Sequence, residues 1–458
     1  MNITIKFLFA ILCCMILTSC AQKETELDIE LDVPQSLDEK NVSSEFSTSD
    51  KWWENFGDAD LNNLISTALD DNLSLNQMWQ RVEQAKQAAA ISGADLAPSV
   101  DISGNAERNR TITTNDKKSY SSLYSTGLIV NYELDIWGRV AANAAAGIYQ
   151  WQASEEDYNA AKISIASQIA NAWFGYIETN RRIQIINQQI KLNEDTLDII
   201  TMQFKRGQAE AVDVLQQRQL LESSRGDKTL LNSQLDILKT QLAVLTGKSP
   251  GKIEIPTRYN LPEINSMPQT GSVSELLNRR PDIKSAYLKI KSYDRTLAAA
   301  VANKMPKINL SAAIVTSDDQ LKGLFDSWQS NIAADLIMPL FDSGKTEAEV
   351  KRQEALKKEA TYAYIETVYN AIKEVRDALS QERNQELYLE SLSKQMQLSK
   401  QSVERIFDSY TKGRSDFLRL LSVQLSDQNL ELSIVSARKN LISYRIDIYK
   451  ALAGKIEI

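Results

Sequence analysis

The feature that most constrains this chain is a duplication, in which two stretches about 206 residues apart follow the same pattern. In each copy a long helical stretch ends in basic residues and a glycine, and a second helical stretch follows. The copies read Phe204-Lys-Arg-Gly207-Gln-Ala-Glu-Ala-Val212-Asp213-Val-Leu215 and Tyr410-Thr-Lys-Gly413-Arg-Ser-Asp-Phe-Leu418-Arg419-Leu-Leu421. Because each unit of a repeat protein buries its apolar face against a neighbouring unit, the duplication predicts a scaffold.

Two shorter motifs are repeated at almost the same spacing. A proline followed by alternating apolar and polar residues occurs at 97–103 and again at 305–311. A segment that closes on Gly-Arg or Gly-Lys occurs at 134–139 and again at 340–345. The duplicated unit therefore contains strand-like segments as well as helices.

Residues 138–207 carry the longest helical signal, because no proline interrupts them and apolar residues recur every seven positions. One sevenfold line comprises Ile169, Tyr176, Ile183, Ile190, Leu197 and Phe204. An adjacent line comprises Ile165, Ala172, Ile186 and Ile200. A helix of about 65 residues that rises ~1.5 Å per residue would be roughly 100 Å long, so we expect a coiled-coil rod.

The second copy repeats this rod, with one break at Glu382. Its sevenfold line comprises Val375, Leu389, Met396, Val403 and Tyr410. Cations suit the C-terminal end of a helix and glycine adopts a left-handed cap, so each rod should end at its glycine. The chain should then reverse into return helices at 211–246 and 416–453. Shorter helices are expected at 73–96 and 281–304.

Four further segments alternate apolar and polar residues with period two. The clearest apolar series fall on even-numbered positions: Tyr124, Leu128, Val130, Tyr132, Leu134 and Ile136; Ile308, Leu310, Ala312 and Ile314; and Trp328, Ile332, Ala334, Leu336, Met338 and Leu340. A weaker series is Val100, Ile102 and Ala106. Lengths near ten residues fit transmembrane β-strands. A soluble sheet with one buried face has the same period.

Four strands in a bilayer could not close on themselves. An open sheet edge in hydrocarbon leaves backbone groups unpaired at a cost of several kcal/mol each. Other copies of the chain would have to complete the barrel. Two copies would give eight strands around a filled interior, whereas three would give twelve strands around a passage.

The N-terminus favours export and lipid attachment. Lys6 precedes an apolar run at 7–17, which is too short to span a bilayer and typical of a signal peptide. The sequence Leu17-Thr18-Ser19-Cys20 resembles the lipobox of bacterial lipoproteins, in which the cysteine becomes the acylated first residue. An ordinary secretory signal with an incidental cysteine is the alternative. Acylation of Cys20 would leave the mature chain without a free thiol.

Composition argues against an enzyme and against nucleic-acid binding. The chain has no histidine, which removes the commonest general base and metal ligand. Cleavage after Ser19 would leave 51 basic and 60 acidic residues, a net charge of −9, and an acidic exported protein is a poor candidate for nucleic-acid binding. No catalytic residue, cofactor-binding residue or metal ligand is predicted, and no cofactor is expected.

Three motifs in fixed order resemble those of one protein family. They read Trp52-Trp53-x-x-Phe56-x-Asp58-x-x-Leu61, Tyr132-Glu133-Leu134-Asp135-Ile136-Trp137-Gly138-Arg139, and Leu277-x-Arg279-Arg280-Pro281-Asp282-Ile283. With the lipobox and the two tips, they make essentially the whole mature chain similar to TolC-like outer membrane factors, specifically NodT-type outer membrane lipoproteins of RND efflux systems.

This resemblance implies a mainly α fold with membrane β structure. Three chains with four strands each would form a 12-stranded β-barrel on a 12-helix α-barrel of long coiled-coil hairpins, with an internal two-fold repeat. The trimer would sit in outer membrane lipid as the exit channel of a tripartite pump, with a periplasmic adaptor and an inner-membrane RND-type transporter as partners. The implied domains are a signal peptide at 1–19, a lipidated tether at 20–50, a first repeat at 51–247, a connector at 248–271 and a second repeat at 272–458.

The resemblance also nominates site residues. Periplasmic tip or gate candidates are Phe204, Gly207, Asp213, Tyr410, Gly413, Asp416 and Arg419. Aspartates often constrict the tip in this family, but Arg419 and Ser422 stand at two such positions here. Closure of the channel at the tips is therefore predicted to use Asp213, Arg419 and Tyr410. The alternative is that each tip residue only caps a helix or packs between the helices.

Lipid-facing barrel candidates are Tyr124, Leu128, Val130, Leu310, Trp328 and Ile332. Polar extracellular loops are expected at about 107–120 and 316–327. Two other classes of protein compete with the channel interpretation. A periplasmic adaptor also has a lipid anchor but typically carries one hairpin, whereas an exported enzyme would need a catalytic motif that the sequence lacks.

Overall fold

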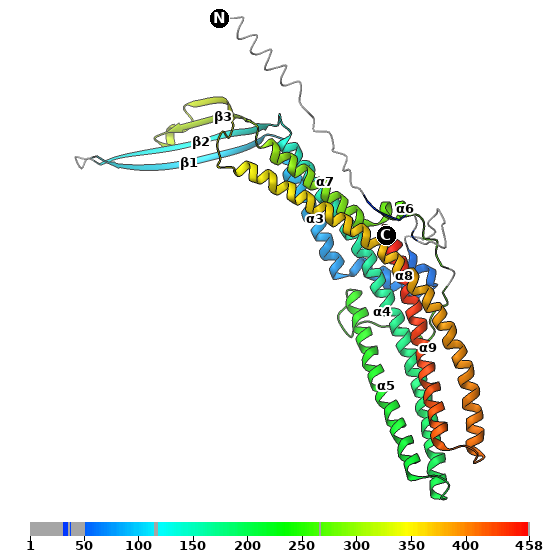
Figure 1. Ribbon diagram of the computed structural model, residues 1–458. Helices are drawn as coiled ribbons and strands as arrows, with labels where there is room; N and C mark the ends of the chain where they lie inside the picture. The colour runs from blue at the N-terminus through cyan, green and yellow to red at the C-terminus, as the bar shows by residue number, and fades with distance from the viewer. Residues whose placement is uncertain (1–30, 35–36, 38–50, 114–117, 265–266, 457–458) are drawn as a thin grey trace. The chain divides into compact units, whose positions relative to one another are not determined.

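The computed structural model describes residues 31–34, 37, 51–113, 118–264 and 267–456. The predicted signal, Cys20 and most of the predicted tether lie outside these residues. Within them the elements follow one another in the order η1-α2-α3-β1-β2-α4-α5-α6-α7-β3-η2-β4-α8-α9 (Figure 1). The chain forms two compact units, one of Gln80–Glu156 with Lys284–Glu366, the other of Asp32–Trp79 with Asp157–Ile283 and Thr367–Ile458.

The predicted rods are confirmed. Helices α4 (Arg139–Lys205) and α8 (Lys345–Thr411) are each 67 residues long and begin 206 residues apart. They are followed by return helices α5 (Ala211–Leu245) and α9 (Phe417–Leu452). None of the helices in the described ranges is both long enough and apolar enough to cross a membrane.

The shorter helices also match expectation. Helix α3 spans Leu73–Ala94 and α7 spans Pro281–Ala302, close to the predicted 73–96 and 281–304. Three more short elements precede them in the two halves: η1 (Trp52–Phe56), α2 (Ala59–Asp71) and α6 (Val273–Arg279).

The strands form one four-stranded antiparallel sheet in the order β1-β2-β3-β4. Their bounds are β1 Ser99–Ile112, β2 Lys118–Leu134, β3 Lys307–Asp318 and β4 Trp328–Ile337. The register pairs even-numbered residues with even-numbered residues throughout, for example Ile102 with Leu128 and Leu128 with Ile314. Because side chains alternate between the faces of a strand, all the even positions share one face.

Two predicted loops are shorter than expected. Strand β1 continues to Ile112 and β2 begins at Lys118, so most of the predicted loop 107–120 is paired strand. Strand β3 extends to Asp318, and η2 (Leu321–Gly323) lies in the remainder of the predicted loop 316–327. The loops were predicted too long because most residues at the far ends of these strands are polar on both faces, and apolar alternation does not detect a strand there.

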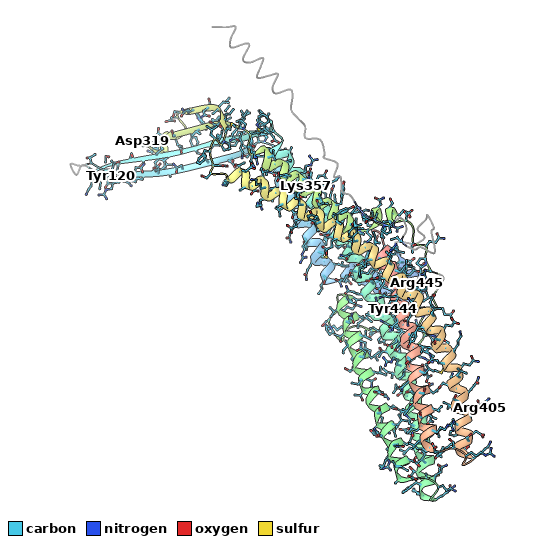
Figure 2. The ribbon with its side chains drawn as sticks, in the orientation of Figure 1. Tyr120, Asp319, Lys357, Arg405, Tyr444 and Arg445 are labelled. Carbon is cyan, nitrogen blue, oxygen red and sulfur yellow. The ribbon has the colours of Figure 1, made fainter. Side chains whose placement is uncertain are left out.

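In the first unit, close contacts join the helical segments that flank the sheet. A Cβ added to Gly147 of α4 would lie 3.1 Å from Ala89 Cα of α3, so glycine permits this approach. Ser292 Oγ donates a hydrogen bond to Ala146 O across 3.0 Å. Lys357 Nζ of α8 lies 2.6 Å from Asp294 Oδ1 of α7, and this ion pair joins the two helices. Figure 2 labels Lys357.

The core of the second unit is built on the tryptophan motif. Trp52 stacks on Tyr449 with ring centroids 5.7 Å apart, and the Phe56 ring lies 5.1 Å from that of Phe174. Asp58 caps α2 through backbone N–H groups and also accepts a 2.8 Å hydrogen bond from Trp173 Nε1. Through these ring contacts and this hydrogen bond, the motif packs the start of the first repeat against α4 and α9.

Glu382, which breaks the sevenfold line of α8, is fully buried and paired with Arg445 of α9. Figure 2 labels Arg445. Arg445 Nε lies 3.0 Å from each carboxylate oxygen, and Nη2 also donates to Oε1. Both side chains are almost completely excluded from solvent. A lone buried charge is costly, so the break in the seam marks a contact between two helices.

We predict that Glu382→Ala destabilises the chain by about 3–5 kcal/mol, because the Arg445 guanidinium would stay buried without its carboxylate. Urea unfolding followed by circular dichroism measures the difference. Lys394→Ala is the matched control, since the Lys394–Glu390 pair is exposed and should change stability by less than about 1 kcal/mol. Equal small effects of the two substitutions would contradict the prediction.

Candidate functional site

The two hairpin tips have the same turn geometry. Gly207 and Gly413 adopt left-handed φ angles of 71° and 69°. The amide of each glycine donates to the carbonyl three residues earlier, and the next residue donates to the carbonyl five residues earlier. This is the Schellman pattern, which satisfies the last carbonyls of a helix. Both predicted caps are therefore present.

The return helices begin with acidic caps. Asp213 accepts a 3.0 Å hydrogen bond from the Glu210 amide, and the two residues form a capping box at the start of α5. Asp416 is the N-cap of α9 and accepts a 2.7 Å bond from the Arg419 amide. A negative charge at a helix N-terminus is favourable, so each carboxylate has a structural role within its own hairpin.

The two tips share a small apolar core. Its buried members are Ile200, Val214, Phe417, Leu420 and Leu421. Tyr410 packs against them, its ring centroid 6.0 Å from that of Phe417. The Tyr410 hydroxyl donates to Gln203 Oε1 and so joins α8 to α4. Burial, and then the negative charge of Asp213, raise the pKa of Tyr410, which keeps the hydroxyl protonated as the donor.

Other nominated tip residues face solvent. Phe204 has 45% of its side chain exposed, and Arg419 is exposed on the first turn of α9. Within the described part of one chain, no ion pair joins Asp213 to Arg419. A pair between these residues would thus require a neighbouring copy.

A buried polar layer separates the tip core from the main core, and the sequence pattern did not identify it. Asn193 of α4 is completely buried and donates to Ser224 Oγ of α5 across 3.1 Å. Gln217 donates to the Asn193 carbonyl across 3.0 Å, and Gln428 of α9 donates to Asn193 Oδ1 across 3.2 Å. Buried polar pairs of this kind fix the register of packed helices.

The sheet places all six lipid-facing candidates on its even-numbered face. These residues are Tyr124, Leu128, Val130, Leu310, Trp328 and Ile332. Ile332 is 90% exposed and Trp328 59% exposed, so nothing within one chain covers this face there. The odd-numbered face carries mostly polar side chains, including Asp101, Glu133 and Asp335.

The two later signature motifs are structural joints. Arg139 makes a bidentate contact with Glu133, at 2.9 and 2.7 Å, where β2 leads into α4. Arg280 contacts Asp282 at 3.0 and 2.7 Å, Glu374 of α8 at 2.9 Å and the Ala451 carbonyl at 3.1 Å.

In the described ranges, no group of three or more His, Cys, Asp or Glu residues is arranged to hold a metal ion.

Comparison with known proteins gives concordant matches. The family model described as "Outer membrane efflux protein" matches residues 64–248 and 272–454. Outer membrane protein OprJ of Pseudomonas aeruginosa is 29% identical over 415 residues, which cover 88% of this chain and 86% of OprJ. A probable outer membrane lipoprotein, SilC of Salmonella typhimurium, is 25% identical with 89% of each chain covered.

Solved structures agree on the fold. The open state of the MtrE outer membrane channel of Neisseria gonorrhoeae superposes with a TM-score of 0.81. The two sequences are 26% identical, and the match covers 94% of this chain and 97% of that one.

The tip geometry predicts opposite effects of one substitution at two glycines. A Cβ at Gly207 or at Gly226 would meet no atom within 4 Å, but only Gly207 has a left-handed φ. Gly207→Ala should cost about 1–2 kcal/mol, because an alanine Cβ strains this conformation. Gly226→Ala, within α5, should stabilise by roughly 0.5–1 kcal/mol, because alanine is the better helix former. Denaturant unfolding compares both variants, and the same sign for both would refute this account of the turn.

Proposed function

The chain belongs to the outer membrane efflux protein family, and on that premise we propose that three copies assemble into the exit channel of a tripartite efflux pump. It is an outer membrane efflux channel, the function that sequence analysis predicted. The alternative of a periplasmic adaptor is set aside, because the family match covers both repeats. The two matched stretches support the proposed repeats at 51–247 and 272–458, with a connector at 248–271.

The open sheet is the observation that carries the trimer. One chain supplies four strands, and β1 and β4 each have one unpaired edge within the described sheet. The sheet also has one apolar and one polar face. In a bilayer, backbone groups need partners, so β1 of one copy is proposed to pair with β4 of the next. Three copies would give twelve strands, with the apolar even-numbered face toward lipid and the polar face toward the lumen.

The return helix α5 supports lateral assembly independently. Leu230, Ile237 and Val244 recur at seven-residue spacing and are 71%, 57% and 54% exposed. Scattered exposed apolar residues are ordinary, but a sevenfold line is the pattern of a helix that packs on another helix. We assign this line to a helix of a neighbouring copy, within a 12-helix α-barrel.

The partners follow from the proposed role. A periplasmic adaptor is proposed to dock at the hairpin tips, and an inner-membrane RND-type transporter to supply the cargo.

Cys20 is proposed as the lipidated residue that adds a second attachment to outer membrane lipid. Mass spectrometry of the N-terminal peptide tests this assignment, since Cys20→Ser should abolish the acyl mass whereas Cys14→Ser should leave it. No catalytic role is proposed.

Native mass spectrometry and planar-bilayer recording test the channel itself. Full-length protein purified in an uncharged detergent should give the mass of three chains and should insert as an ion-conducting pore. A purified monomer that never conducts would overturn the proposal.

The gate hypothesis uses the same recordings. We propose that Asp213 and Arg419 of neighbouring copies attract one another and, with Tyr410, hold the tips closed. Asp213→Asn keeps an oxygen for the Glu210 amide but removes the charge, so it and Arg419→Ala should both raise the closed-state leak. Arg405→Gln, an exposed position on α8, should leave the leak unchanged. A wild-type leak in both tip variants would remove the hypothesis.

A further inference from the structure

The even-numbered face of the sheet changes character along its strands. From Leu134 to Tyr124, β2 presents mostly apolar or aromatic side chains on this face. At ~3.4 Å per residue this stretch is about 34 Å long. A strand tilted by ~40° would give it a height of roughly 26 Å, close to the ~25 Å apolar band of outer membrane barrels.

Aromatic residues mark the far end of this band. Tyr124 of β2 and Trp328 of β4 lie there, and Trp328 contacts Phe325 with ring centroids 6.2 Å apart. Tyr120 lies two even positions further out, past Ser122, and is 59% exposed; Figure 2 labels it near the end of the β1–β2 pair. Aromatic side chains prefer the boundary between hydrocarbon and headgroups.

Beyond Tyr124 and Trp328, at the level of Tyr120, the same face becomes basic. Arg108, Arg110 and Lys118 occupy even positions, with Arg110 paired to Tyr120 across the two strands. The Arg108 guanidinium lies over the Tyr120 ring, 5.6 Å from its centroid. All three cations are exposed, and no ion pair neutralises any of them in the described part of the chain.

The strand acids are distributed in the opposite way. Asp101, Glu107, Glu133 and Asp335 fall on the odd-numbered face. Asp318 is the one acid at an even position of the described strands, and its Oδ1 accepts a 2.7 Å hydrogen bond from the Gln320 amide. The cations therefore lie on the lipid-facing side, just past the apolar band, where a membrane presents its headgroups.

We propose that Arg108, Arg110 and Lys118 form a binding site for the phosphate groups of a lipid headgroup in the outer leaflet. The assignment rests on the proposed function, since it takes the even-numbered face as the lipid face and the far strand ends as external. Guanidinium groups match phosphate geometry in a bidentate manner, and clustered cations at a membrane surface attract anionic lipid. Phosphorylated glycolipid is the occupant that fits this leaflet.

Native mass spectrometry of the full-length protein, titrated with phosphorylated lipid A in an uncharged detergent, tests the site. The variant Arg108→Gln/Arg110→Gln/Lys118→Gln should bind lipid A about tenfold more weakly than the wild type, and the difference should shrink at high salt. The control variant Lys358→Gln/Lys400→Gln/Arg405→Gln removes three exposed helical cations and should bind as the wild type does.

The outcomes separate this inference from the proposed function. The same spectra report the mass of the assembly, so a wild-type monomer would count against the trimer. If the wild type and the Arg108→Gln/Arg110→Gln/Lys118→Gln variant are both trimers and bind lipid A equally well, the proposed site is wrong. Lipid A without phosphate should show no difference between wild type and variant. Complete displacement by millimolar inorganic phosphate would reveal a site for free anions and would also overturn the lipid assignment.

Discussion

The rest of this structure depends on the hydrogen-bonding demand of the backbone at the two edges of the sheet. Strands β1 and β4 are the outer strands of an open sheet whose even-numbered face carries a band of apolar residues, with Ile332 of β4 90% exposed. Hydrocarbon offers no hydrogen bonds, so an outer membrane protein with this sheet needs partner strands at both edges. In the proposed trimer the internal duplication has a clear use, because each chain would contribute two hairpins of strands and two hairpins of helices to a ring.

In the long helices the difficulty is register, because a uniform apolar seam would allow two packed helices to pair in several registers. The buried contacts between helices are specific in this chain. Asn193 joins α4 to α5 and α9, and Glu382 pairs with Arg445 between α8 and α9. Each contact tolerates little sliding, because a shift by one helical turn would leave a buried polar or charged group without its partner. The signature arginines Arg139 and Arg280 fix the helix ends in the same way.

Much of the fold was predictable from the sequence because its signals are local and periodic. Sevenfold apolar spacing predicted both rods, terminal glycines predicted both turns, and period-two alternation predicted which strand residues share a face. The predictions of buried positions and of strand ends failed where the side chains are polar, because both predictions depend on the spacing of apolar residues. The seam line that runs through Ile186 and Ile200 also contains Thr179 and Asn193, which are polar in sequence but buried in the structure. The prediction of a loop at 107–120 fails for the same reason, because the far ends of β1 and β2 are mostly polar.

By itself the sequence determined the duplicated plan, the rods with their glycine turns, and the amphipathic strands, because each depends on residues a few positions apart. Only the tertiary structure decided that Glu382 meets Arg445 across 63 residues, and that Tyr410 reaches Gln203 across 207. It also decided which even-numbered residues of four strands lie beside one another, and hence that Arg108, Arg110 and Lys118 gather on one face. Contacts between distant residues depend on how helices and strands pack, and no local spacing in the chain encodes that packing.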